Sequence, residues 1–333
     1  MNSVGIDISK GRSTIAVMRP FGEVVISPFE VRHTDSELSE LARQLKILDG
    51  ETRVVMEATG NYHAPVAKLL HDAGLYVSVV NAKLVHGYGN NDLRRVKTDR
   101  KDAVKLANYG LDRWLTLPRY VPEENTRLLL KNCYRQYRQY SKVQTVLKNN
   151  LISLLDMTFP NANRLFVSPA RADGSEKWVD FVAEFWHCEC VSERSLKSFV
   201  NKYWRWCRKH GYNFSEEKAH AIYDEASGHI GVMPKSETTK LLVEQAVSQL
   251  SATSAALAAL KQEMQSLSSQ LPEYPVVMGM FGVGPILGPQ LIAEIGDVRR
   301  FYSKKALVAY AGIDAPPNDS GDVIGRHKSM SKV

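Results

Sequence analysis

The first 110 residues alternate short apolar runs with stretches of helical spacing. Three runs rich in β-branched residues come first, and turns containing glycine or polar residues separate them. These runs predict a three-stranded meander. They are SVGIDIS, STIAVMRP and GEVVISPFEV.

Helices and strands alternate after this meander. TDSELSELARQLKIL has helical spacing with an N-cap at Thr34 or Asp35, and TRVVMEA follows as a fourth strand. APVAKLLHDAG predicts a helix closed by Gly74, LYVSVVNA a fifth strand, and DRKDAVKLANYGL a further helix. This is a ribonuclease-H-like order of elements, so an α/β domain is expected over residues 1–110.

Residues 111–270 are predicted to be mostly helical. Their first stretch has helical apolar spacing and interleaves basic residues with tyrosines. The basic residues are Arg127, Lys131, Arg135, Arg138, Lys142 and Lys148, and the tyrosines are Tyr134, Tyr137 and Tyr140. Two interpretations stay open: the tyrosines stack on bases while the cations meet phosphates, or the tyrosines simply pack. The same alternatives apply to Trp204 and Trp206 in the basic segment 201–214.

Residues 236–271 contain neither proline nor glycine and are rich in Ala, Leu, Gln and Ser. Apolar residues at three-to-four spacing suggest a long helix that pairs in a coiled coil, joining protomers or separating domains. Packing of this helix within its own chain is the competing interpretation. The apolar positions are Leu242, Ala246, Leu250, Ala256, Leu257, Leu260, Met264 and Leu267.

Four acidic residues of the N-terminal domain lie within or at the ends of its predicted strands and last helix. Asp7 lies in the first strand and Glu57 at the end of the fourth. Asp99 and Asp102 are three residues apart, where a helix puts both carboxylates on one face. Gathered in one pocket, such carboxylates repel one another unless cations neutralise them, and their oxygens suit Mg²⁺. Separate surface charges or helix caps are the alternative.

Composition limits what such a site could belong to. The 333 residues carry a formal net charge of +7, which favours a polyanionic partner. Lys97, Arg100 and Lys101 flank the acidic pair and are candidate phosphate contacts, with solvated surface charge as the alternative. No window approaches the ~20 apolar residues that cross a bilayer, and the first residues do not resemble a signal peptide. A cytoplasmic protein with no membrane partner is expected.

The four cysteines are Cys133, Cys188, Cys190 and Cys207, too few and too irregularly spaced for a disulfide framework. Cys188 and Cys190 follow His187 closely, but a zinc site usually needs a second ligand pair at short spacing. Ordinary buried or half-buried thiols are therefore the favoured interpretation.

The C-terminal segment, residues 271–333, changes character again. Gly282-Val283-Gly284 precedes a predicted helix, a pattern typical of a helix-hairpin-helix turn whose backbone amides meet a phosphate. Plain turn formation is the alternative for these glycines. Further along, Ser320 precedes a glycine, and Arg326 and Lys328 follow as candidate nucleic-acid contacts. A serine hydroxyl is a weak nucleophile unless a base, a metal or cations assist it.

Five of these motifs together resemble the DEDD transposases of the insertion-sequence one-ten family, which are similar to Piv-type DNA invertases. The motifs are GIDISK, MEATGNY, KTDRKDA, GVGPILGPQLIAEIGD and YAGIDAPPNDSG. The resemblance implies a RuvC-like DEDD nuclease domain over 1–110, a helical, coiled-coil region over 111–270 and a small, mainly α transposase domain over 271–333. That last domain is expected to be short at its C-terminal end.

The resemblance also implies a mechanism. It assigns the metal-binding tetrad to Asp7, Glu57, Asp99 and Asp102, and the nucleophile to Ser320. The serine attacks a DNA phosphate and forms a transient phosphoserine link, and Mg²⁺ held by the tetrad assists. The implied partners are donor and target DNA, a structured noncoding bridge RNA that supplies sequence choice, and further copies of the chain, which complete a composite active site. The protein would associate with the nucleoid when acting.

Two other classes of function remain open from the sequence. A RuvC-like metal-dependent nuclease acting by water attack needs the acidic tetrad but not Ser320. A catalytically silent nucleic-acid-binding protein derived from a mobile element needs neither. Substitution of Ser320 separates the recombinase from the nuclease, and Mg²⁺ dependence separates both enzymes from the binding protein.

Overall fold

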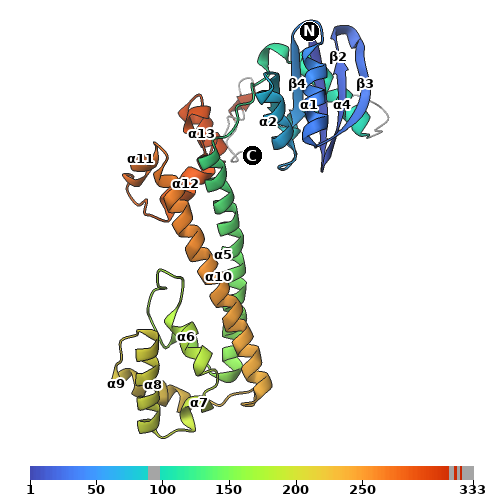
Figure 1. The fold of residues 1–333 in the computed structure, drawn as a ribbon. Helices are drawn as coiled ribbons and strands as arrows, with labels where there is room; N and C mark the ends of the chain where they lie inside the picture. The colour runs from blue at the N-terminus through green and yellow to red at the C-terminus, as the bar shows by residue number, and fades with distance from the viewer. Residues whose placement is uncertain (89–97, 315–318, 321–322, 325–333) are drawn as a thin grey trace. The chain divides into compact units, whose positions relative to one another are not determined.

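The computed structural model describes residues 1–88, 98–314, 319–320 and 323–324 (Figure 1). The chain divides into two compact units, Met1–Glu123 and Glu124–Val333. None of the described helices combines the length and the apolar character needed to cross a membrane.

The first unit is built on a five-stranded mixed sheet. Its strands are β1 (Asn2–Ser9), β2 (Arg12–Met18), β3 (Val24–Arg32), β4 (Thr52–Glu57) and β5 (Tyr76–Val80). They lie in the order β3-β2-β1-β4-β5, with β1, β2 and β3 antiparallel and β4 and β5 parallel to β1. The meander followed by alternating helices and strands, as predicted from the sequence, is confirmed.

Helices cover both faces of this sheet. They are α1 (Asp35–Lys46), α2 (His63–Asp72), α3 (Ala82–Gly87) and α4 (Asp99–Asp112). On one face, Val4 and Ile6 are fully buried in a core with residues of α1 and α2. On the other face, Val55 packs with Leu106 and Tyr109 of α4. Of the two predicted N-caps of α1, Thr34 and Asp35, the N-cap is Thr34, whose side chain accepts from the Glu37 amide.

The first unit extends to Glu123, past the limit of residue 110 expected from the sequence. The segment after α4 returns to the edge strand β5. The amide of Tyr120 donates to the Val77 carbonyl at 2.7 Å, and the Tyr76 hydroxyl donates to the Leu117 carbonyl at 2.7 Å. These bonds attach residues 113–120 to the sheet.

The second unit is built around two long helices, α5 (Asn125–Thr158) and α10 (Glu237–Ser269). They pack antiparallel, because Leu130 near the start of α5 shares a core with Met264 and Leu267 near the end of α10. The Gln144 side chain donates to Ser254 at 2.9 Å midway along the pair. Within this chain, α10 therefore packs against α5, as the intrachain alternative predicted. A coiled coil between protomers remains a prediction.

Short helices pack at one end of the pair. They are α11 (Tyr274–Met278), α12 (Leu287–Ile295) and α13 (Lys304–Tyr310), followed by β6 (Asp319–Ser320) and β7 (Val323–Ile324). Ile292 and Ala293 of α12 join the core formed by α5 and α10. The predicted middle and C-terminal segments thus share one compact unit.

The other end of the pair carries a lobe of four short helices, here called the helical lobe (residues 159–235). They are α6 (Lys177–Glu184), α7 (Glu189–Ser192), α8 (Leu196–His210) and α9 (Glu216–Gly228). The lobe starts and ends at the last turn of α5: the Cys188 amide donates to the Thr158 carbonyl at 3.0 Å, and the Val232 amide to the Met157 carbonyl at 2.8 Å.

The lobe core is aromatic. Phe181 stacks on Phe185 with ring centroids 4.7 Å apart, and Tyr203 stacks on Trp206 at 5.7 Å. Trp206 is 2% exposed, so the packing interpretation is right for this residue, whereas Trp204 is 41% exposed. Cys188 and Cys207 are buried in the same core, where burial raises the pKa of the Cys207 thiol.

Candidate active site

The register of β1 and β4 sets the positions of Asp7 and Glu57. In this parallel ladder Gly5 pairs with Val55 and Ile6 with Met56. The residues that follow these pairs, Asp7 and Glu57, therefore lie side by side at the carboxyl ends of the two strands. Because side chains alternate along a strand, both belong to the face that α4 covers.

Close backbone packing lays α4 against β1. A Cβ atom at Gly5 would lie 2.0 Å from the Ala103 carbonyl oxygen and 2.4 Å from the Ala107 nitrogen, so only glycine fits there. At the other end of the helix, a Cβ at Gly110 would lie 2.3 Å from Ser3 Oγ. The helix thus runs antiparallel to β1, and its first turn lies at the end of β1 that carries Asp7.

That first turn contributes the remaining two acids. Thr98 caps the helix, its hydroxyl accepting from the Lys101 amide at 3.3 Å. Asp99 and Asp102 follow within the first turn, where negative charge also interacts favourably with the helix dipole. Asp102 is half-buried, as are Asp7 and Glu57, whereas Asp99 is exposed.

Three elements thus bring the predicted tetrad to one edge of the sheet, here called the acidic edge. Its donors are all carboxylate oxygens, which are the ligands that Mg²⁺ prefers. Over the described ranges, however, no three His, Cys, Asp or Glu side chains are arranged so that they could hold a metal ion together. The fold brings the backbones of the four acidic residues to one edge of the sheet. Their role as metal ligands remains a prediction.

The basic residues next to the acidic pair are only partly described. Arg100 and Lys101 lie exposed in the first turn of α4. Lys97 lies outside the described residues. Phosphate contact by these side chains stays a prediction.

One titratable residue close to Glu57 in the chain was not singled out from the sequence. His63 begins α2, after the loop that leaves β4 at Glu57, and it is half-buried. Burial lowers the pKa of His63, so the neutral imidazole is favoured at neutral pH. Its only sequence signal is a histidine shortly after the acidic strand end, and this does not distinguish it from a structural residue.

The predicted contacts on α5 are exposed cations. Arg135, Arg138 and Lys142 all lie on the surface of this helix. Tyr134 and Tyr137 pack against the core shared by α5, α10 and α12, so packing describes these two tyrosines better than base stacking does. Tyr140 is 40% exposed.

The predicted helix-hairpin-helix turn lies between α11 and α12. Gly282 has a φ of +80°, a conformation that favours glycine, and a Cβ at Gly282 or Gly284 would meet nothing within 4 Å. Two short helices joined by an open glycine turn therefore match the predicted local structure. Contact between the amides of this turn and a phosphate stays a prediction.

The backbone of Ser320 is described, and its side chain is not. Ser320 pairs with Val323 in the two-stranded ladder of β6 and β7. Arg326 and Lys328 lie outside the described residues. The nucleophilic role of Ser320 accordingly stays a prediction.

Two solved structures align with part of the chain. Thermus thermophilus RuvC in complex with a Holliday junction substrate is 13% identical, covers 36% of this chain and 99% of its own, and has a TM-score of 0.27. A second T. thermophilus RuvC structure is 16% identical over 36% of this chain and all of its own, with a TM-score of 0.25. Because both TM-scores are low, the ribonuclease-H-like fold of the first unit is argued from its strand order and not from these alignments.

Curated relatives align more extensively. A 44.8 kDa uncharacterized protein of insertion element IS116 from Streptomyces clavuligerus is 24% identical over 328 residues, 97% of this chain and 78% of that protein. The pilin gene-inverting proteins of Moraxella bovis and Moraxella lacunata are each 27% identical over 134 residues, which is 40% of this chain and 38% of theirs.

Two family models match the two ends of the chain. The DEDD transposase model of IS110, described as a transposase, matches residues 4–160 and thus includes all four acids of the acidic edge. The model of the IS116/IS110/IS902 transposase family matches residues 274–333, including Ser320. Because the two matches together span more than half of the sequence, the chain belongs to the IS110 family of transposases.

Proposed function

We propose that this transposase is a Mg²⁺-dependent site-specific DNA recombinase that cuts and rejoins DNA through a phosphoserine intermediate. The observation that carries the proposal is the acidic edge, where β1, β4 and the first turn of α4 bring four acidic residues to the same edge of the sheet. A water-exposed edge of this kind, next to exposed Arg100 and Lys101, can accept a DNA phosphate together with its cations.

Asp7, Glu57, Asp99 and Asp102 would hold the metal. When bound, Mg²⁺ neutralises the charge that develops on the phosphoryl oxygens and stabilises the leaving oxygen. The fold would hold these carboxylates in place, because strand pairing and the Gly5 contact fix the backbones of β1, β4 and α4, which carry them.

Ser320 would be the nucleophile. Its hydroxyl oxygen attacks the phosphorus of one phosphodiester and loses its proton to solvent or a neighbouring base. A bond forms between phosphorus and Ser320 Oγ, and the bond from phosphorus to one sugar oxygen breaks. That sugar oxygen leaves with a proton, and the reverse attack by a sugar hydroxyl later rejoins the strand.

Further copies of the chain and an RNA complete the proposal. We propose that the tetrad and Ser320 act from different protomers of a dimer or tetramer, held by an interprotomer coiled coil. A bridge RNA would select target and donor DNA by base pairing, which leaves the protein to recognise backbone and shape. The net charge of +7 supports a polyanionic partner of this kind.

The test is a covalent adduct assay. The protein is copurified with RNA transcribed from the flanks of its element, incubated with labelled donor and target DNA and Mg²⁺, and run on a denaturing gel. We expect a protein–DNA adduct that disappears in Ser320→Ala and when EDTA replaces Mg²⁺. Cleavage that persists without an adduct would instead indicate a hydrolytic nuclease, and binding without cleavage a silent nucleic-acid-binding protein.

A further inference from the structure

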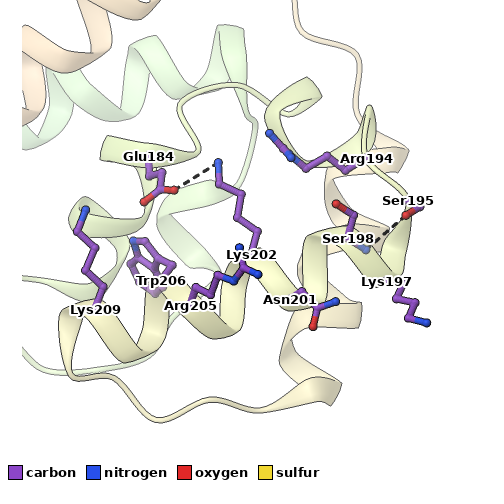
Figure 2. A pocket seen from close by; sticks show the side chains of 10 residues that line it. All are labelled: Glu184, Arg194, Ser195, Lys197, Ser198, Asn201, Lys202, Arg205, Trp206 and Lys209. Carbon is purple, nitrogen blue, oxygen red and sulfur yellow. Dashed lines mark hydrogen bonds and ion pairs between the residues drawn. The ribbon is translucent and has the colours of Figure 1, made fainter.

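The helical lobe carries a basic groove on α8, here called the α8 groove. It is a pocket of about 680 Å³ (Figure 2). Five of its lining residues are cations and one is an acid: Arg194, Lys197, Lys202, Arg205, Lys209 and Glu184. Both family models leave residues 161–235 of this lobe unmatched, since they cover residues 4–160 and 274–333.

Helical periodicity places these cations on one face. Lys197, Arg205 and Lys209 lie at multiples of four residues along α8, with Asn201 between them, and all four are exposed. The opposite face carries the buried Phe199 and Tyr203. One side of α8 thus builds the core of the lobe, and the other presents positive charge to solvent.

Most of this charge is not neutralised by the protein. Lys202 pairs with Glu184 at 3.3 Å, and Arg194 donates to the Cys190 carbonyl at 3.3 Å. Within the described part of the chain, Lys197, Arg205 and Lys209 form no ion pair with a carboxylate. Mutually repelling cations without acidic partners are typical of a surface whose counter-charge comes from a ligand.

The floor of the groove provides an independent observation. Trp206 lines the pocket and is 2% exposed. Its indole Nε1 is buried and has no hydrogen-bond partner among the described residues. A buried donor without an acceptor costs about 1–3 kcal/mol. Because this atom is closed off from solvent, a ligand would reach it only after the side chains above it move.

We propose that the α8 groove binds the sugar–phosphate backbone of a nucleic acid. From Lys197 to Lys209 the helix extends about 18 Å, along which one strand of a duplex carries about five phosphates. Ser195, Ser198 and Asn201 add neutral hydrogen-bonding groups between the cations. Arg, Lys, Ser and Asn side chains are the usual contacts to phosphate oxygens.

The same physics predicts no base specificity for this groove. Its cations lie in a row on one helix, and backbone contacts fix position without reading sequence. The groove is a binding surface independent of the chemistry proposed for the acidic edge and Ser320. Its role would be to anchor nucleic acid to the helical lobe.

Binding of the full-length protein to labelled 25-base-pair duplexes of one arbitrary sequence, as RNA and as DNA, tests this proposal by fluorescence anisotropy at several salt concentrations. The double variant Arg205→Gln/Lys209→Gln removes two unpaired groove charges. Because each lost phosphate contact lowers the slope of log affinity against log salt by about 0.9, we expect the slope to fall by nearly 2 and affinity to fall about tenfold or more near 0.1 M salt.

Two further variants make the test specific. Lys46→Gln/Lys240→Gln removes the same charge outside the groove, and it should change affinity by less than about twofold. Glu184→Gln removes the one acid of the groove and frees Lys202, so it should raise affinity by about twofold. A gain of binding is opposite in direction to the loss expected from a variant whose groove no longer folds.

The outcomes separate cleanly. A loss confined to the RNA duplex, to the DNA duplex or shared by both supports the proposal and identifies the source of the phosphates. Equal losses in the groove variant and the Lys46/Lys240 control, or an unchanged salt slope, would overturn it. Ser320→Ala should bind as the unaltered protein does, so failure of the serine mechanism would leave this result intact.

Discussion

The acidic edge and the α8 groove collect charge in two different ways. The acids of the edge come from three elements, brought together by strand pairing and by the contact of Gly5 with α4. The cations of the groove come mainly from one helix, placed by its 3.6-residue period. The edge therefore depends on tertiary packing, and the groove depends on local sequence.

The largest effect should come from breaking the packing under the acidic edge. Gly5→Val puts a branched side chain where a Cβ alone would lie 2.0 Å from the Ala103 carbonyl oxygen. Since backbone atoms cannot yield as a flexible side chain does, we expect the free energy of unfolding to fall by about 3 kcal/mol or more. Urea unfolding followed by circular dichroism measures this loss.

Gly87→Ala is the matched control in the same unit. A Cβ at Gly87 would meet nothing within 4 Å, so the change should alter stability by less than about 1 kcal/mol. If Gly5→Val unfolds at the same urea concentration as this control, the close approach of α4 to β1 is not what positions the edge.

The next largest effect is on catalysis. Asp7→Asn removes a carboxylate that we propose as a metal ligand, and adduct formation should fall by at least about 10²-fold. The control Glu30→Gln changes an exposed acid on β3 that pairs with Arg12 of β2. It should leave adduct formation intact.

Arg127 in the second unit is a buried, paired cation, unlike the exposed and unpaired cations of the α8 groove. Arg127 is 5% exposed and bonds Glu273 at 3.0 Å through Nη2. Arg127→Met leaves Glu273 without this partner and should lower the free energy of unfolding by about 3 kcal/mol while nucleic-acid binding stays unchanged. The double variant Arg127→Met/Glu273→Met should recover part of that loss; a double variant less stable than the single one would contradict the pairing.

The same pair predicts a dependence on pH. The hydrogen bond from Arg127 holds the pKa of Glu273 below its usual range. A carboxyl whose folded-state pKa is lowered contributes stability above its unfolded-state pKa, and that contribution disappears as pH falls through the folded-state pKa. The stability difference between the protein and Glu273→Gln should therefore shrink below about pH 4, measured by thermal unfolding.

The smallest effect should come from one charge added to the groove. Asn201→Asp places a carboxylate among unpaired cations, and it should weaken nucleic-acid binding by a few fold with little change in stability. Anisotropy titration beside Asn201→Gln, which keeps the amide, measures the difference. Equal affinities of the two variants would show that ligands do not reach this face of α8.

The sequence predicted the first unit well because its elements are locally coded. Runs rich in β-branched residues predicted the strands, and Thr34 or Asp35 was predicted to start α1, which Thr34 caps. The order of the acids predicted their meeting at one edge, since parallel strands end on the same side of a sheet. Gly5 carries no comparable signal, because a glycine in a strand looks the same whether a helix crosses it or not.

The second unit was less predictable. The apolar spacing of residues 236–271 indicated a long helix but not its partner, and the partner is α5, about a hundred residues earlier in the chain. Leu242 fitted the spacing yet is 43% exposed, while Ser254 is buried and bonded to Gln144. Spacing alone could not decide between Trp204 and Trp206, because which face of α8 is buried depends on α6 and α9.

The attachment of the helical lobe also bears on how such proteins change length. The chain departs from α5 at Thr158 and is back beside Met157 by Val232, so a short turn could replace everything between. The antiparallel pair of α5 and α10 would then be a plain helical hairpin, provided that the apolar residues which the lobe now covers became polar. These include Leu151 and Leu155 of α5 and Val243, Ala246 and Leu250 of α10. An in-frame deletion of the lobe is therefore a starting point for a smaller version of this transposase.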